Sequence, residues 1–160
     1  MQHATLCYLL KDDQVLLGMK KRGFGEGKWN GYGGKPEPGE SIEEAAIREL
    51  EEEAGILIQL QHLEKMAEID FSFADVSKEK NWDQVVYVFF VRNWEGEPKE
   101  TEEMKPQWFR INEVPINNMW IDDPHWLPLA FEGKKIKANF VFGNKGAEVL
   151  EKNVSIVTDL

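Results

Sequence analysis

Short apolar runs separated by polar turns recur along this chain and predict a series of β-strands. Ala4–Leu10 and Val15–Met19 are two such runs, joined by the polar turn 11–14, as expected for neighbouring strands. Val85–Val91 is almost continuously apolar and rich in β-branched and aromatic residues, which indicates a strand buried on both faces. The same criteria predict further extended segments at Ile56–Leu60, Ala67–Phe73, Gln107–Ile111, Ile136–Phe142 and Val149–Val157.

A first helix is predicted directly after a glycine-rich stretch, residues 23–39. Ser41 is a favourable N-cap residue, and Glu44, three positions later, completes a capping box. The helix is expected to run to Ala54, because Gly55 stands where a helix commonly ends in a left-handed conformation.

A second helix is predicted to begin at Asp123-Pro124, with Asp123 as N-cap and Pro124 at the first helical position. Strands and helices mix along the chain without a regular alternation. The predicted fold class is therefore α/β, a mixed β-sheet sandwiched between helices. A length of 160 residues favours a single domain that spans residues 1–160.

The composition of the chain argues against binding to a nucleic-acid polymer and against a membrane span. The chain has 29 acidic and 19 basic residues, a formal net charge of −10, which would repel a nucleic-acid polymer. No apolar run approaches the roughly 20 residues that a membrane span needs. The apolar run near the start lacks a charged leader, and Cys7, the single cysteine, has no disulfide partner. We therefore expect a cytoplasmic monomer without a membrane or nucleic-acid partner.

The first predicted helix carries an unusual acidic face. At 100° per residue, Glu49, Glu52 and Glu53 fall within an arc of about 100°, whereas Glu44 and Glu51 lie on the far side and are expected to face solvent. The adjacent arc is apolar and is expected to pack on the sheet; it consists of Ala46, Ile47, Leu50 and Ala54.

Three carboxylates on one helix face repel each other unless a cation joins them. Carboxylate oxygens are suitable ligands for Mg²⁺, and the preceding glycine-rich loop allows backbone groups to approach a metal or a phosphate closely. Arg48 lies four residues before Glu52 and is expected to hold that carboxylate in a salt bridge. A solvated acidic helix without a metal is the alternative explanation of the same pattern.

The order of residues from Gly34 to Ile56 separates these two explanations. Gly34 is followed after five residues by Glu40 and, after seven more, by Arg48-Glu49-Leu50-Glu51-Glu52-Glu53-Ala54-Gly55-Ile56. This order resembles the signature segment of the Nudix hydrolases without a departure.

The resemblance implies a Nudix fold and hydrolysis of a nucleoside diphosphate linked to another moiety, with Mg²⁺ or Mn²⁺ as cofactor. It implies that one glutamate of the acidic face activates the attacking water. Arg48 would then orient the carboxylates, and Glu40 would support the loop. The metal ligands implied by the resemblance are Glu49, Glu52 and Glu53, with the carbonyl of Gly33.

Segments outside the acidic helix extend the resemblance to one branch of the family. Residues 18–25, 28–35 and 119–123 are similar to the MutT-type enzymes of mammals, which clear oxidised purine nucleoside triphosphates. The residues that this similarity assigns to a base-binding pocket are Phe24, Asn30, Phe71, Trp120, Asp122 and Asp123. Each also has a structural explanation, such as a turn for Asn30, a helix cap for Asp123 and core packing for Trp120.

Three further assignments rest on the same similarity. Thr5 would line the base pocket, Lys20 would meet the triphosphate, and Glu103 would supply an additional metal-binding acid. The register of the acidic run 100–103 leaves Glu100 and Glu102 open as substitutes for Glu103. Residues 74–83 depart from the pattern of the branch and are interpreted as an insertion.

The leading hypothesis is hydrolysis of an oxidised purine nucleoside triphosphate, of the 8-oxo-dGTP or 2-hydroxy-dATP type, to the monophosphate and pyrophosphate. This reaction would clean the nucleotide pool. One alternative keeps the chemistry and changes the nucleotide to a normal or methylated purine triphosphate, a dinucleoside polyphosphate or a nucleotide sugar. A remoter alternative is a non-catalytic nucleotide-binding module. Two adjacent aspartates do not ionise independently, so Asp122 and Asp123 together offer a donor and an acceptor to a modified base.

Overall fold

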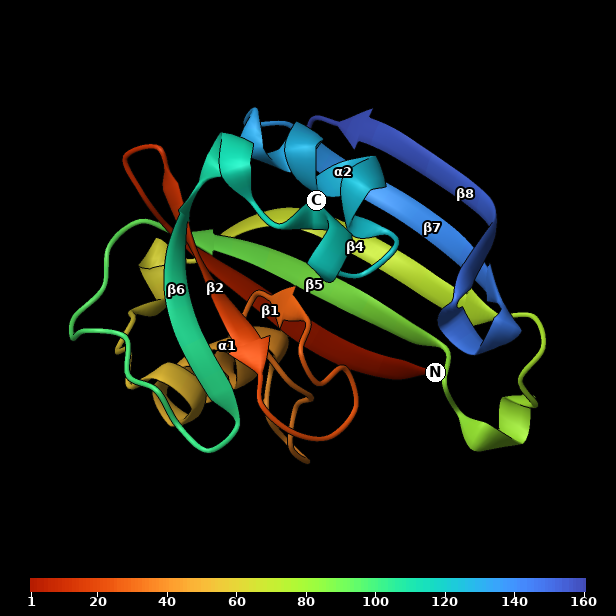
Figure 1. Cartoon of the computed structure of the whole chain (residues 1–160), viewed down its shortest axis with the longest axis horizontal. Helices are drawn as coiled ribbons and strands as arrows, with labels where there is room; N and C mark the ends of the chain where they lie inside the picture. The colour runs from red at the N-terminus through yellow and green to blue at the C-terminus, as the bar shows by residue number, and fades with distance from the viewer.

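The computed structural model describes all residues, 1–160, and contains one mixed β-sheet with a helix on each face (Figure 1). The order in the sheet is β3-β2-β1-β5-β4-β7-β8, and β6 also pairs with β2. The pairs β1–β5 and β4–β7 are parallel and the other pairs are antiparallel. The strands are β1 (Gln2–Lys11), β2 (Gln14–Lys20), β3 (Trp29–Asn30), β4 (Glu64–Phe73), β5 (Gln84–Val91), β6 (Met104–Arg110), β7 (Lys135–Gly143) and β8 (Glu148–Val157).

Two apolar cores lie on opposite faces of this sheet. The helix α1 (Ile42–Ala54) covers one core, and α2 (Asp123–Phe131) covers the other, as Figure 1 shows. The alternation along β1 divides its side chains between them, with Cys7 in the core under α1 and Tyr8 in the core under α2. The strand β5 is buried on both faces, as its continuous apolar run predicts.

The glycine-rich segment is built into the sheet. The strands β1 and β2 pair only next to their turn, from Leu9↔Leu16 to Lys11↔Gln14, and then separate. The segment 29–34 fills the gap, because β3 pairs with β2 while Tyr32 pairs with Cys7 of β1. The loop that precedes α1 is thus held by two strands at once.

The helix α1 begins and ends as the sequence predicts. The Ser41 hydroxyl accepts a hydrogen bond from Glu44 N at 3.1 Å, and the Glu44 carboxylate accepts one from Ser41 N at 3.4 Å. Gly55 follows the last turn with φ +70°, a conformation that glycine adopts without a Cβ penalty. The residues buried against the sheet are Ala45, Ala46, Leu50 and Ala54, with Ile47 partly buried.

Two local predictions are wrong. The segment Ile56–Leu60 is not a strand: only Leu57 forms a bridge, to Glu95, and a 3₁₀ turn begins at Leu60. The alternation of apolar residues in this segment has another cause, since Ile56 and Ile58 both pack in the core under α1.

The second wrong prediction concerns the start of α2. The helix begins at Asp123, Asp122 is the N-cap residue, and no side chain caps the helix. Both carboxylates accept hydrogen bonds from other groups, Asp122 from the Trp126 side chain and Asp123 from the Trp120 backbone. Neither α1 nor α2 is long and apolar enough to cross a membrane.

The capping box gives a first testable prediction. Ser41→Ala removes the acceptor of the Glu44 N–H and is expected to lower the free energy of unfolding by about 0.5–2 kcal/mol. Urea denaturation measures this change, with Ser155→Ala on the exposed strand β8 as the matched control. Equal stability of the two variants would contradict the assigned cap.

Candidate active site

The acidic face of α1 lies beside the glycine loop and forms one wall of a cleft of about 550 Å³. A Cβ at Gly33 would lie 1.8 Å from the Thr5 carbonyl oxygen, and a Cβ at Gly34 would lie 2.4 Å from Glu49 Oε1. Only glycine permits these two approaches, one to the β1 backbone and one to the carboxylate.

Glu53 is the most enclosed of the three acidic residues. Its Oε1 accepts a hydrogen bond from Gly33 N at 3.0 Å. Burial, followed by the charge of Glu49, raises the pKa of Glu53 to about 8, and burial also raises the pKa of Glu49. Without a cation, ionising this pair is therefore unfavourable.

Arg48 joins the acidic residues to the loop. Its Nε and Nη2 donate to Glu40 at 2.8 and 2.9 Å, and its Nη1 donates to Glu49 at 2.9 Å. The predicted salt bridge to Glu52 is present at 3.3 Å, but Glu40 is the closer partner. Hydrogen bonding to Arg48 lowers the pKa of Glu40 to about 2. Glu40 also accepts from Glu37 N at 2.9 Å, which matches its expected role in supporting the loop.

The donor set of the cleft fits a hard divalent cation. Glu49, Glu52 and Glu53 all line it with Gly33, and the Gly33 carbonyl accepts no hydrogen bond, so its lone pairs are available. The three carboxylates are not gathered as a ready-made metal site, because Glu49 and Glu52 both bind Arg48 and Glu53 binds the loop. Metal binding thus requires side-chain rotation rather than a change of backbone.

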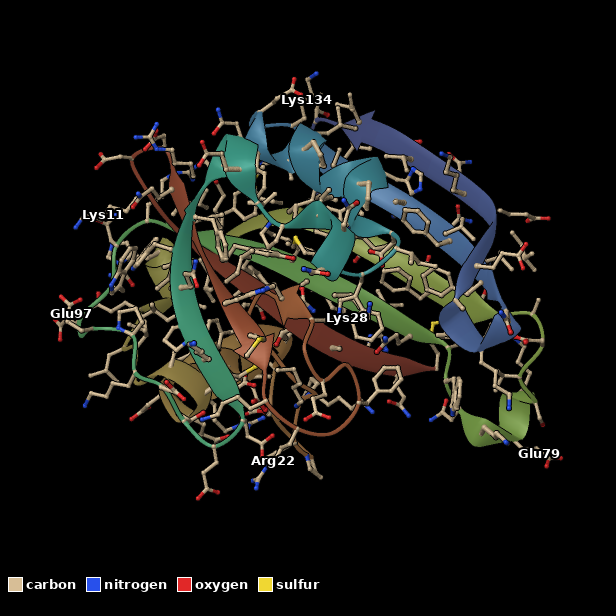
Figure 2. The ribbon with its side chains drawn as sticks, viewed as in Figure 1. Lys11, Arg22, Lys28, Glu79, Glu97 and Lys134 are labelled. Atoms are coloured by element: carbon tan, nitrogen blue, oxygen red, sulfur yellow. The ribbon has the colours of Figure 1, made fainter.

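The rest of the cleft lining carries both signs of charge. Lys20 and Arg22, at the end of β2, line it together with Glu102 and Glu103, and Arg22 lies at the lower edge of the molecule in Figure 2. Arg22 Nη2 lies 2.6 Å from Glu103 Oε1, and Lys20 Nζ lies 3.6 Å from Glu103 Oε2. Glu102 and Glu103 both line the cleft, whereas Glu100 binds Lys21 and does not. Of the alternatives for an additional metal ligand, Glu100 is thus the poorest placed.

A second group of candidate residues gathers on the other face of β1, around Trp120. The Phe24 ring lies 5.2 Å from the Trp120 ring, centroid to centroid, and Lys28 Nζ lies 5.5 Å from the Trp120 ring centroid. Lys28 projects near the centre of the view in Figure 2. Phe24 is 81% exposed, but its ring contacts the indole. Gly25 also approaches Trp120 closely, because a Cβ at Gly25 would lie 2.9 Å from the same indole.

Asp122 and Asp123 are both buried next to Trp120. Asp122 Oδ2 accepts from Trp126 Nε1 at 2.9 Å, and Asp123 Oδ2 accepts from Trp120 N at 3.0 Å. Burial raises the pKa of Asp122 to about 6, and burial together with the Asp122 charge raises the pKa of Asp123. The expectation that the pair retains a proton agrees with these directions.

Asn30 is connected to the aspartate pair through a tyrosine. Its Oδ1 accepts from Tyr8 OH at 3.3 Å and from Gly31 N at 2.9 Å, and its amide nitrogen donates to no protein group. The charges of Asp123 and Asp122 act on Tyr8, whose pKa is raised mainly by burial. Asn30 therefore lies at the end of β3, and its side-chain N–H groups remain available to a ligand.

Two expected pocket residues lie elsewhere or have other contacts. The Thr5 hydroxyl exchanges hydrogen bonds with Gly34 at 3.2 and 3.3 Å, and strand alternation places it on the face opposite Tyr8. The expected place of Thr5 in the base pocket does not match this position, which holds the glycine loop instead. Phe71 stacks on Phe140 and Phe142 and has no ring contact with Trp120.

The interpreted insertion 74–83 is an ordered loop between β4 and β5. Asp83 Oδ1 accepts from Phe73 N at 3.1 Å, and Gln2 Nε2 donates to Asn81 O at 2.8 Å. Trp82 is partly exposed and packs edge-on against Phe73. Glu79 marks the outer end of this loop in Figure 2, away from the acidic cleft.

Comparison with known proteins agrees with this geometry. A NUDIX domain model matches residues 1–130, which is most of the chain. The chain belongs to the Nudix family. Members of this family need a divalent metal ion, and the glutamates of α1 stand where the family signature places its acidic residues.

Among its Nudix relatives, the chain is 45% identical over 157 residues to the oxidized purine nucleoside triphosphate hydrolase of Danio rerio, covering 98% of this chain and 96% of the relative. It is 45% identical over 138 residues to the protein of the same description in Mus musculus, covering 86% and 85%. A crystal structure described as a mutator MutT protein from Bacillus halodurans matches with a TM-score of 0.79 at 28% identity, covering 97% and 98%.

Several residues of this Nudix site were not predicted from the sequence. Tyr8 lies in an apolar run, and Lys28 and Arg22 lie in charged loop ends. No local pattern distinguishes them, because each acquires its place from contacts distant in sequence.

The raised pKa of Glu53 gives a second prediction. A carboxylate with a raised folded-state pKa contributes stability that is present below about pH 4.5 and is lost as the pH rises through about 8. In EDTA, the wild type is therefore expected to lose stability over this window, and Glu53→Gln to be more stable at pH 9 by about 1–3 kcal/mol.

Thermal unfolding in EDTA between pH 5 and pH 9 measures this difference. Glu51→Gln, on the exposed side of α1, is the matched control and should follow the wild type. A parallel pH dependence of the wild type and Glu53→Gln would show that Glu53 is not the group responsible.

Proposed function

We propose that this Nudix protein hydrolyses oxidised purine nucleoside triphosphates to the monophosphate and pyrophosphate, with Mg²⁺ as the cofactor. One observation carries the proposal: the segment 29–34, held between β1 and β2, carries both Asn30, which contacts Tyr8, and Gly33, which lines the acidic cleft. This segment joins the cleft to the pocket of Trp120 and its two buried aspartates, and a nucleotide would place its phosphates in the cleft and its base in the pocket. The description of the zebrafish and mouse relatives supports this choice of substrate.

Glu49, Glu52 and Glu53, with the Gly33 carbonyl, would hold the metal ion. When bound, Mg²⁺ neutralises charge on the phosphate oxygens and makes water easier to ionise. A glutamate of the cleft takes a proton from water, the water oxygen bonds to phosphorus, and the bond between the α- and β-phosphoryl groups breaks. Arg48 keeps the carboxylates oriented, and Lys20 meets the phosphate charge that pyrophosphate carries away.

Base selection is assigned to the second pocket. The indole of Trp120 offers a broad stacking surface for a purine, and Phe24 and Lys28 complete that wall. The Asn30 amide donates to the base edge, while the proton shared by Asp122 and Asp123 lets the pair donate and accept at once. A pocket of this kind recognises an oxidised purine by its altered pattern of donors and acceptors. We expect the enzyme to act as a cytoplasmic monomer.

The experiment that tests this function is pyrophosphate release from 8-oxo-dGTP, 2-hydroxy-dATP, dGTP and dATP in Mg²⁺. We expect kcat/KM to be at least tenfold higher for an oxidised purine than for its normal counterpart. Glu53→Gln is expected to lower turnover by about 10²–10⁴-fold on every nucleotide, because general-base and metal-binding groups contribute on this scale.

The alternatives correspond to different results of the same assay. Turnover without preference for oxidised bases would retain the hydrolytic chemistry and redirect the search to other nucleotides, with the loop 74–83 as the region to exchange. Nucleotide binding without turnover in any divalent metal would instead indicate a non-catalytic module.

Asp122 gives a prediction about selectivity. Asp122→Ala is expected to alter base selectivity more than hydrolysis itself, but it also leaves Trp126 Nε1 without an acceptor. Asp122→Asn keeps an acceptor and removes the shared proton. It is expected to lower kcat/KM for the oxidised purine by about 10–100-fold, which is the size of one lost charged hydrogen bond, and to change that for dGTP less. Asp70→Asn, at an exposed position, is the control; equal losses on all nucleotides would argue against the assignment.

A further inference from the structure

One buried polar atom in the chain has no hydrogen-bond partner, and it is the hydroxyl of Tyr32. Buried polar groups in folded proteins are nearly always hydrogen-bonded, and leaving one without a partner destabilises the fold. Tyr32 is completely buried in the core under α1. A phenylalanine would fill the same space without this cost, so the hydroxyl requires an explanation.

The neighbours of this hydroxyl are adjacent in sequence to residues that line the acidic cleft, because Met104 follows Glu103 and Tyr32 precedes Gly33. A Cβ at Gly18 would lie 3.0 Å from Tyr32 Oη and 2.6 Å from the methyl group of Met104. These neighbours from β2 and β6 are apolar and offer no acceptor. The next residue, Gly33, donates its N–H to Glu53 and lines the cleft. The charged group that acts on the Tyr32 hydroxyl through space is also Glu53.

The position of Glu53 on α1 agrees with this placement. Glu53 stands seven residues after Ala46 and three after Leu50, which both pack in the core that contains Tyr32. Its side chain thus emerges from the sheet-facing side of the helix, directly over the glycine loop. Gly33 N occupies only one lone pair of Oε1, and a carboxylate has about four acceptor positions. Glu53 can therefore bind a metal ion and accept a second hydrogen bond.

We propose that Tyr32 is a positioning residue of the metal centre, whose hydroxyl donates a hydrogen bond to the Glu53 carboxylate once that side chain has turned to hold a divalent cation. In the metal-free chain the hydroxyl remains unpaired, and binding of the cation supplies its acceptor. The cost of the unpaired group is removed on loading, which couples metal affinity to the core under α1. This inference rests on the proposed metal-dependent function.

The test compares Tyr32→Phe with the wild type by titration with Mn²⁺ alone, by unfolding in EDTA and by turnover. We expect the Tm of the variant in EDTA to equal or exceed that of the wild type, because an unpaired buried group has been removed. We expect its Mn²⁺ Kd to rise about tenfold, the effect of one hydrogen bond to a charged group, and its kcat to fall by a similar factor. In a Glu53→Gln background, Tyr32→Phe should have no additional effect on kcat.

Tyr87→Phe is the matched control, since this partly buried tyrosine contacts His3 and Lys65 and does not line the cleft, and it should change neither Mn²⁺ affinity nor turnover. Mn²⁺ affinity and kcat of Tyr32→Phe within twofold of wild type would overturn the inference, as expected if the hydroxyl serves only packing or a trapped water. A marked loss of Tm in EDTA would overturn it too, because the role would then be structural. A wild type that binds no Mn²⁺ would remove the proposed function itself, and this inference with it.

Discussion

The contact between the glycine loop and the backbone of β1 is the constraint on which the site depends. Gly33 lies so close to the Thr5 carbonyl that no side chain fits between them. This approach is possible because β1 and β2 separate beyond their turn and leave a gap of one strand's width. The same approach brings the Gly33 N–H to Glu53. The position of the acidic helix face relative to the sheet is therefore set by backbone packing rather than by its charges.

The acidic side chains of α1 contact Arg48 on the helix and the backbone of the glycine loop. Arg48 bridges Glu40, Glu49 and Glu52, so one guanidinium offsets repulsion within the face and ties the helix to the loop. Glu53 has no such cation, and its burial makes ionisation unfavourable in the absence of metal. Under the proposed function, a bound cation would offset this charge. Similar logic applies at Asp122 and Asp123, where burial retains a proton instead of recruiting a cation.

The parts of this structure that the sequence predicted are those with local signals. The limits of α1 follow from Ser41, Glu44 and Gly55, and β5 follows from an apolar run with no polar interruption. The prediction of a strand at Ile56–Leu60 was wrong because two apolar loop residues that pack in the core have the same spacing as in a short strand. A capping carboxylate at Asp123 was equally reasonable from local chemistry, but its partner is the Trp120 backbone, which lies outside the helix. Roles that depend on the opposite strand or the opposite face, such as those of Tyr8 and Lys28, have no local signal.

The division of β1 between two separate cores has a consequence for how such a protein diversifies. In the proposed reaction, the groups assigned to the anhydride and the groups assigned to the base are supported by different helices and share little besides one strand. Substitutions around α2 could then alter the shape offered to a base while the core under α1 stays intact. The groups proposed for the reaction and those proposed for recognition can thus change separately. The strand β1, which both share, would fix the distance between the base and the bond that breaks.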